Sequence, residues 1–207
     1  TRMSQREQSF MKALFHGVVA EELLYPYPKL GARDRDGVSS LLEALRRFAE
    51  RYVDSGRFER EHTINDDALE ALKRTGVFGL TVPEEYGGLG LGQMATARVL
   101  QELGMIDASI AALVTCHICM GVSGILAFGS AEQKKRFLPA MASGERIAAF
   151  ALTEERAGSD ASAIATRATF ALDGAGFVLE GQKLWISNAK WADLFITFAR
   201  TDLEAGH

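Results

Sequence analysis

The feature that most constrains the fold is a change of hydrophobic period near residue 147. Before this position, apolar residues recur at three- and four-residue spacing over long segments, which predicts amphipathic helices. After it, short apolar runs alternate with Gly- and Asp-containing turns, which predicts strands. Because helices and strands are segregated along the chain, we predict an α+β fold: an all-helical domain followed by an antiparallel, β-barrel-like domain.

The expected domain boundaries follow from this change. We expect residues 1–37 to form an N-terminal helix and an extended strap, residues 38–146 the helical domain, and residues 147–207 the β domain. An apolar stripe over 10–24 predicts one amphipathic helix, which the prolines at 26 and 28 end. The segment 31–37, Gly-Ala-Arg-Asp-Arg-Asp-Gly, predicts an exposed linker.

The remaining elements follow from periodicity and capping signals. Asn65 or Asp66 can cap one helix, and Ser130 with Gln133 forms a capping box for another. Asp107 or Ser109 opens a helix that is apolar nearly all round and is therefore expected inside a helical bundle. The expected helices are 39–53, the one that follows residue 65, 93–104, the one that ends near 128, and 131–138; the expected strands are 147–153, 164–172, 177–180, 183–187 and 194–199.

Composition excludes several classes of protein. The chain has 207 residues, 47% of them hydrophobic, and a net charge of −4, which suits one or two domains with a substantial core. This weak acidity gives no reason to expect a nucleic-acid or anionic-membrane partner. No apolar run is expected to reach the roughly 20 residues of a membrane span. Two cysteines do not make a disulfide scaffold, so a reducing compartment is the default.

The two cysteines form a C-x-x-C motif, Cys116 and Cys119, in the middle of the long apolar helix. A zinc site needs two more ligands, and a redox motif of this kind is expected at a helix start. We therefore expect both cysteines to be buried small side chains, His117 to be a packed and hydrogen-bonded core residue, and no metal site.

Two segments of the second half combine a strand with a polar turn. The first, residues 147–160, ends in a turn that carries Thr153, Ser159 and Asp160 and the amides around Gly158. Hydroxyls and amides clustered at a strand end can bind anionic or carbonyl-rich ligands, although the same pattern is equally typical of an ordinary turn. The second segment, 181–188, has the sequence Gly-Gln-Lys-Leu-Trp-Ile-Ser-Asn.

Together these two segments resemble the "LTE-x-x-x-GSD" loop and the "G-x-K-x-W-I-T/S-N" strand of the acyl-CoA dehydrogenase family. Residues 82–90 are similar to that family's "P-E-E-Y-G-G-x-G" turn, and residues 137–145 to its "Y/F-L-P-x-x-x-x-G-E" segment. The resemblance covers roughly residues 60 to 202. A weaker likeness of residues 10–17 to the very-long-chain branch of the family suggests a preference for long acyl chains.

The resemblance implies an FAD site. In it, Thr153 and Ser187 would bond the flavin ring, Trp185 would pack against it, and Ser159 would also contact the acyl-CoA. One residue departs from the family pattern: Glu155 stands where Pro is usual, which places an extra negative charge near the cofactor's phosphates. The full set of expected cofactor-binding residues is Phe150, Leu152, Thr153, Gly158, Ser159, Trp185, Ile186 and Ser187.

The resemblance also implies an activity: α,β-dehydrogenation of fatty acyl-CoA thioesters in fatty-acid β-oxidation, with electrons passed to an electron-transfer flavoprotein. The family's catalytic glutamate lies in a third, C-terminal helical domain, which is expected beyond residue 207, so no residue is assigned as the base and Glu154 is not that base. A homodimer or homotetramer, in a bacterial cytoplasm or the mitochondrial matrix, is expected.

Two other functions stay open at this point. One is a different enzyme on the same scaffold, such as a flavin monooxygenase or a relative of nitroalkane oxidase. The other is a non-catalytic subunit that pairs with a chain carrying the base. Fold resemblance alone does not separate these, because function depends on the site.

Overall fold

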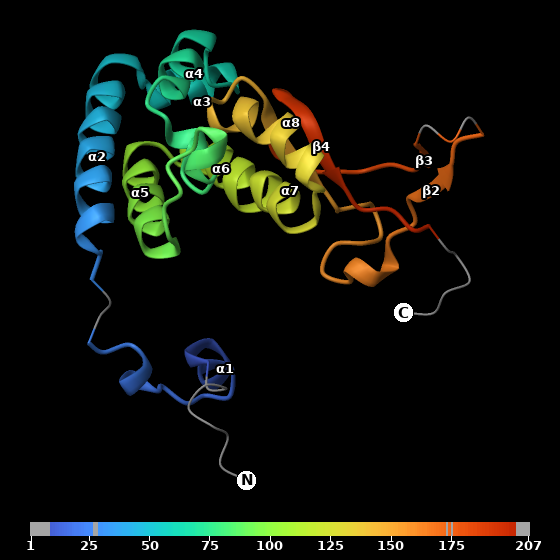
Figure 1. Ribbon diagram of the computed structural model, residues 1–207, viewed down its shortest axis with the longest axis horizontal. Coiled ribbons are helices and arrows are strands. Elements are labelled where there is room, and N and C mark those ends of the chain that lie inside the picture. The colour runs from blue at the N-terminus through green and yellow to red at the C-terminus, as the bar shows by residue number, and fades with distance from the viewer. Residues whose placement is uncertain (1–8, 27–28, 173, 175, 202–207) are drawn as a thin grey trace.

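The computed structural model describes residues 9–26, 29–172, 174 and 176–201. Figure 1 shows a body of packed helices, with short strands at one side and the small helix α1 set apart at the N-terminal side. The helices are α1 (Phe10–Phe15), α2 (Ala32–Tyr52), α3 (Ser55–Glu61), α4 (Asp66–Lys73), α5 (Gln93–Ile106), α6 (Ala108–Thr115), the π-helical η4 (Cys116–Val122), α7 (Ser123–Phe128) and α8 (Ala131–Ala142). Short 3-10 turns are η1 (Glu21–Leu23), η2 (Val77–Gly79), η3 (Glu84–Tyr86) and η5 (Ala161–Ala163).

The core of the helical body is built from the apolar faces that the periodicity predicts. Leu45 of α2, Leu72 of α4, Leu103 of α5 and Ile110 of α6 are all completely buried. The predicted caps are confirmed where Asn65 accepts from the amide of Ala68 and where Asp107 opens α6. The capping box of α8 is confirmed as well.

A buried carboxylate joins two of these helices. Glu102 of α5 accepts from Arg46 of α2 at 2.7 Å and from Arg98 of its own helix at 3.1 Å. The hydrogen bond from Arg46 lowers the pKa of the Glu102 carboxyl more than its burial raises it. The pair of guanidinium groups therefore holds Glu102 ionised at the α2–α5 contact.

One continuous helical segment, α6–η4–α7, crosses the body. It spans 21 residues and is long and apolar enough to cross a bilayer by length and composition, so the prediction that no apolar run reaches that length is wrong. The segment contacts α5, α8, β1 and β4, and 44% of its apolar window is buried inside the structure.

His117, in the π-helical part of this segment, connects three elements. The main-chain N–H of Ala148 in β1 donates to His117 Nδ1 at 3.1 Å, so Nδ1 is unprotonated and Nε2 donates to the Met141 carbonyl, also at 3.1 Å. The ring also meets Phe78 edge-on, with centroids 5.2 Å apart. The prediction of a packed, satisfied core histidine is confirmed.

The strands form two separate pairs. β1 (Ile147–Ala151) pairs with β4 (Ala192–Thr197), and β2 (Arg167–Phe170) pairs with β3 (Phe177–Glu180). The β2–β3 hairpin is antiparallel, but β1 and β4 are parallel, so the prediction of antiparallel pairing is wrong for that pair. In sequence, β4 lies beyond the whole β2–β3 hairpin from its partner β1.

Several other predicted boundaries are wrong. Residues 32–37 are not a linker but the start of α2, and a helix that was not predicted, α3, follows Asp54, whose side chain accepts from the amide of Arg57. The expected helix over 10–24 ends at Phe15, because Gly17 takes a positive φ of 74° and breaks it. The prolines expected to end it lie at 26 and 28, and the second is outside the described residues.

Candidate functional site

The candidate site begins where β1 ends. β1 is buried except for Phe150, which is only partly buried and packs against Phe198 with ring centroids 5.0 Å apart. The chain then enters the loop 152–160, which folds back on itself, because the amide of Glu154 donates to the Ala157 carbonyl at 2.7 Å. A rigid buried strand thus carries a polar loop, the arrangement in which binding residues are often found.

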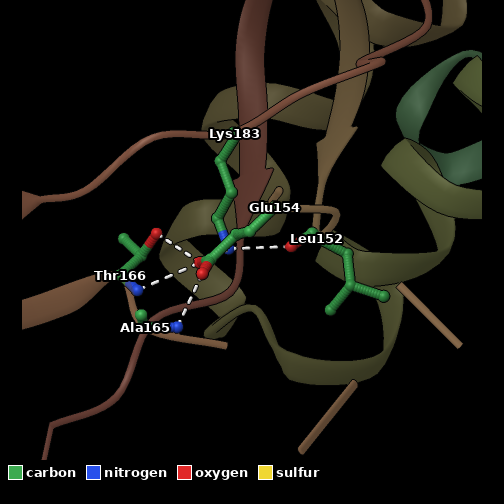
Figure 2. Close-up of polar contacts among 5 residues, drawn as sticks. All are labelled: Leu152, Glu154, Ala165, Thr166 and Lys183. Carbon is green, nitrogen blue, oxygen red and sulfur yellow. Dashed lines mark hydrogen bonds and ion pairs between the residues drawn. The ribbon is translucent and has the colours of Figure 1, made fainter. Parts of the chain in front are cut away.

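Glu154 organises this loop. One carboxylate oxygen accepts from Lys183 Nζ at 2.7 Å and from the amide of Thr166 at 3.0 Å, and the other accepts from the amide of Ala165 at 2.6 Å. The Thr166 hydroxyl donates to the same carboxylate, and Lys183 Nζ also donates to the Leu152 carbonyl at 2.8 Å. Figure 2 shows these five residues converging from three segments of the chain. We refer to these contacts as the Glu154 network.

The Glu154 network stabilises the ionised carboxylate. Burial of the group acts to raise its pKa, but hydrogen bonds from Lys183, Thr166 and the amide of Ala165 outweigh burial and lower the pKa to about 2. Only 9% of the Glu154 side chain and 12% of the Lys183 side chain are exposed, so water screens this ion pair weakly. A carboxylate with this pKa and these donors is a poor general base.

The second segment of the site, residues 181–188, has no regular structure. The predicted strand 183–187 is wrong, because Trp185 takes a left-handed φ of 58°, which interrupts an extended ladder. The segment is held instead by side-chain contacts and by one amide, that of Leu184, which donates to the Thr153 carbonyl at 2.9 Å. Its far end is fixed by Asn188, whose buried amide donates to the carbonyls of Leu113 and Ala148 at 2.9 and 3.1 Å.

The expected cofactor-binding residues do not all lie together in space. Thr153 and Trp185 are brought near each other, because Leu184, the residue before Trp185, bonds the Thr153 main chain. Leu152 and Ile186 are half-buried beside them in sequence, whereas Gly158 and Ser159 are exposed farther along the loop. The Trp185 side chain is 90% exposed, an unusual state for the largest apolar residue.

Phe150 and Ser187 face two different concave surfaces. Phe150 lines a groove of about 600 Å³ together with Cys119, Phe128 and Phe198. Ser187 lines a cleft of about 500 Å³ whose other walls come from α3, α6 and the loop between α3 and α4. Within the described part of the chain, these two expected site residues therefore do not share one pocket.

The cysteines differ from expectation. Cys116 is only half-buried and Cys119 is exposed at the groove that Phe150 lines, so the prediction that both are buried is wrong. Partial burial nevertheless raises the pKa of the Cys119 thiol, which disfavours the reactive thiolate. Among the described residues, no group of three or more His, Cys, Asp or Glu side chains is placed to hold a metal ion.

Sequence reasoning missed the structural importance of two residues in the second segment. Lys183 carries the ion pair and Asn188 anchors the segment, and neither was assigned a role. Both residues belong to the Gly-Gln-Lys-Leu-Trp-Ile-Ser-Asn motif at 181–188. The place of the lysine inside this motif was the sequence signal that could have identified it. Its partner could not be identified, because Glu154 lies 29 residues away in sequence.

Two family models match the chain. Residues 37–145 match the N-terminal domain of acyl-CoA dehydrogenase, and residues 149–207 match its middle domain. The two matches divide the chain between the helical body and the strands.

Individual relatives agree with these matches. The chain is 40% identical over 195 residues to the mitochondrial very long-chain specific acyl-CoA dehydrogenase of Macaca fascicularis, covering 94% of this chain and 30% of the relative. It is 41% identical over 200 residues to the probable acyl-CoA dehydrogenase FadE10 of Mycobacterium bovis, covering 96% and 30%. The chain thus spans about 30% of the length of these curated relatives.

A solved structure gives the same result. An acyl-CoA dehydrogenase from Bacillus anthracis, solved in complex with FAD, superposes with a TM-score of 0.73 at 32% identity, over 84% of this chain and 30% of that one. Motifs, domain models and fold therefore agree along nearly the whole chain, and the chain belongs to the acyl-CoA dehydrogenase family.

Proposed function

We propose that this chain is part of an FAD-dependent acyl-CoA dehydrogenase that introduces a Cα–Cβ double bond into fatty acyl-CoA thioesters during fatty-acid β-oxidation. Electrons would pass to an electron-transfer flavoprotein. Family membership supports the reaction class, and relatives named very long-chain specific support a long acyl chain. The observation that carries the proposal most directly is the exposed Trp185 ring beside the Thr153 loop.

The residues present fit a flavin. An indole that is 90% exposed leaves a large apolar face in water, and a planar ring system packed on it would remove that cost. The Thr153 and Ser187 hydroxyls and the main-chain amides of the loop 152–160 would supply hydrogen bonds to the ring edge and to the anionic parts of the cofactor. FAD, when bound, supplies the redox chemistry by accepting a hydride.

The other residues and the boundaries follow from the same proposal. Phe150, Leu152, Gly158 and Ile186 would complete the cofactor surface, and Ser159 would also contact the acyl-CoA. We propose domains at 1–37, 38–146 and 147–207, of which the second and third overlap the matched family domains at 37–145 and 149–207. The catalytic base and a C-terminal helical domain would lie outside residues 1–207, because no carboxylate here matches the base.

The assembly and location are part of the proposal. We infer a homo-oligomer, a dimer or tetramer, that works in a bacterial cytoplasm or the mitochondrial matrix. One relative is named as mitochondrial and another comes from Mycobacterium bovis, which supports a mitochondrial or a bacterial setting.

The cofactor assignment is tested by replacing the two side chains that would contact the flavin ring. In the natural full-length protein, Trp185→Ala combined with Ser187→Ala should raise the Kd for FAD at least about tenfold, since stacking and a hydrogen bond each contribute about 1 kcal/mol. FAD bound per protein, titrated by flavin absorbance, is the measurement. Phe15→Ala removes an aromatic ring that is 89% exposed elsewhere and is the matched control. An unchanged Kd in the double variant would refute the assignment.

A further inference from the structure

The loop 152–160 is fixed from two sides at the residues around Thr153. On one side, Lys183 and Leu184 contact three successive loop residues: Lys183 bonds the Leu152 carbonyl and the Glu154 carboxylate, and the Leu184 amide bonds the Thr153 carbonyl. On the other side, Ala165 and Thr166 donate to the same carboxylate. Figure 2 shows the Glu154 carboxylate between Lys183 and the Ala165–Thr166 main chain.

We propose that Lys183 and Glu154 are positioning residues that set the distance between Thr153 and Trp185, and thereby hold the FAD-binding surface in its binding-competent shape. This inference rests on the proposed function. Neither side chain needs to touch the cofactor. They act through the loop backbone on one side and through the segment leading to Trp185 on the other.

Sequence adjacency makes this role specific. Lys183 stands two residues before Trp185, and Glu154 stands next to Thr153, so any shift of the ion pair is passed directly to both candidate flavin contacts. The 181–188 segment lacks the strand ladder that would otherwise fix it. Its register against the loop therefore depends on the Leu184 amide and on Lys183.

Loss of the lysine should affect the loop more than an ordinary surface mutation would. Without Lys183, the Leu152 carbonyl loses its donor, and a carboxylate whose side chain is only 9% exposed loses its counter-charge. A buried charge without a partner favours rearrangement that brings water to it. The simplest such rearrangement moves Glu154, and Thr153 with it.

The test uses the natural full-length protein and three variants at the pair. Lys183→Met removes the charge at similar length, Lys183→Arg retains it, and Lys183→Met with Glu154→Gln removes both charges so that no uncompensated ion is left in the fold. Glu102→Gln is the matched control, because Glu102 is an equally buried carboxylate with two guanidinium partners, placed between α2 and α5. The measurements are the Kd for FAD, the visible spectrum of the bound flavin and the thermal midpoint.

We expect Lys183→Met and the double variant to raise the Kd for FAD at least about tenfold and to alter the flavin spectrum, and Lys183→Arg to restore most of the affinity. Glu102→Gln should lower the thermal midpoint while the Kd and the spectrum stay as in the wild type. A folded Lys183→Met or double variant with the wild-type Kd and spectrum would overturn the inference, as would an equal loss of affinity in Glu102→Gln. Wild-type protein that binds no FAD would overturn the proposed function together with this inference.

Discussion

At the scale of single residues, His117 shows how a neutral imidazole can be built into a core. Its Nδ1 accepts from the Ala148 amide and its Nε2 donates to the Met141 carbonyl, so protonation would place a hydrogen against the Ala148 N–H. Burial lowers the pKa of His117 from its ordinary value of 6.5 to about 4, against a smaller opposing effect of the hydrogen bond to Met141.

The lowered pKa of His117 predicts that the free energy of unfolding begins to fall near pH 6.5, above the pH range in which most carboxylates titrate. Because the folded-state pKa is lowered, the contribution of His117 is fully present above about pH 6.5 and is lost as the pH falls toward 4. Between pH 7 and pH 5 the free energy of unfolding should fall by about 2 kcal/mol from this group. In His117→Gln, which keeps one donor and one acceptor but does not titrate, urea unfolding at the two pH values should differ by much less. An equal fall in both proteins would contradict this prediction.

At the scale of elements, the helical body and the strands meet where η4 crosses β1. Gly121 of η4 is buried there, and a Cβ built on it would lie 2.3 Å from the Cβ of Ala148. That separation is far below van der Waals contact, so only glycine permits the observed approach of the two backbones. The hydrogen bond between His117 and Ala148 fixes the same crossing.

Gly121→Ala should therefore destabilise the protein by about 1–3 kcal/mol through overpacking, measured by urea unfolding. The matched control is Gly104→Ala in α5, where an added Cβ meets nothing within 4 Å. That substitution should stabilise the protein by about 0.5–1 kcal/mol, because alanine is the better helix former. Equal effects of the two substitutions would show that helix propensity, and not the crossing with β1, determines the outcome.

The elements also show what the sequence can and cannot predict. The helices around Leu45, Leu72 and Leu103 were predictable because burial of one face imposes a local period. The first turns of α2 were not predictable, because the charged residues 33–36 resemble a linker in sequence. They are helical because they extend a helix that is already stable. The parallel pairing of β1 with β4 leaves no local pattern, because the two strands are more than 40 residues apart.

The same distinction holds for the candidate site. Thr153, Trp185 and Ser187 were predictable, because short motifs carried the family resemblance. The left-handed backbone at Trp185 and the ion pair between Glu154 and Lys183 depend on contacts distant in sequence. Periodicity reports which face of an element is buried, but not which distant group will satisfy a buried charge.

At the scale of the whole molecule, large apolar side chains remain exposed on several separate elements. Phe15 of α1, Phe128 of α7, Phe170 of β2 and Trp185 are each at least 78% exposed. The large apolar side chains of strands β2 and β3, which are Phe170, Phe177, Val178 and Leu179, are all exposed, and a two-stranded hairpin alone is marginally stable. We infer that these surfaces are covered in the working enzyme, by FAD in the case of Trp185.

Residues 1–207 produced alone should consequently bind a hydrophobic dye such as ANS and self-associate as concentration rises. Dye fluorescence and sedimentation velocity measure the two effects, with the natural full-length protein as the reference. A monomer that binds no more dye than the reference protein would show that the exposed side chains are accommodated without a covering surface.

The measurement that tests the central claim most directly is an anaerobic titration of the natural full-length protein with saturated acyl-CoA thioesters of increasing chain length, followed by flavin absorbance. A dehydrogenase of the proposed kind should carry FAD, and its visible absorbance should bleach on addition of substrate, most strongly with long chains. FAD that does not bleach at any chain length would contradict the proposed activity, and reduced flavin that reacts rapidly with oxygen would point to an oxidase or monooxygenase on the same scaffold.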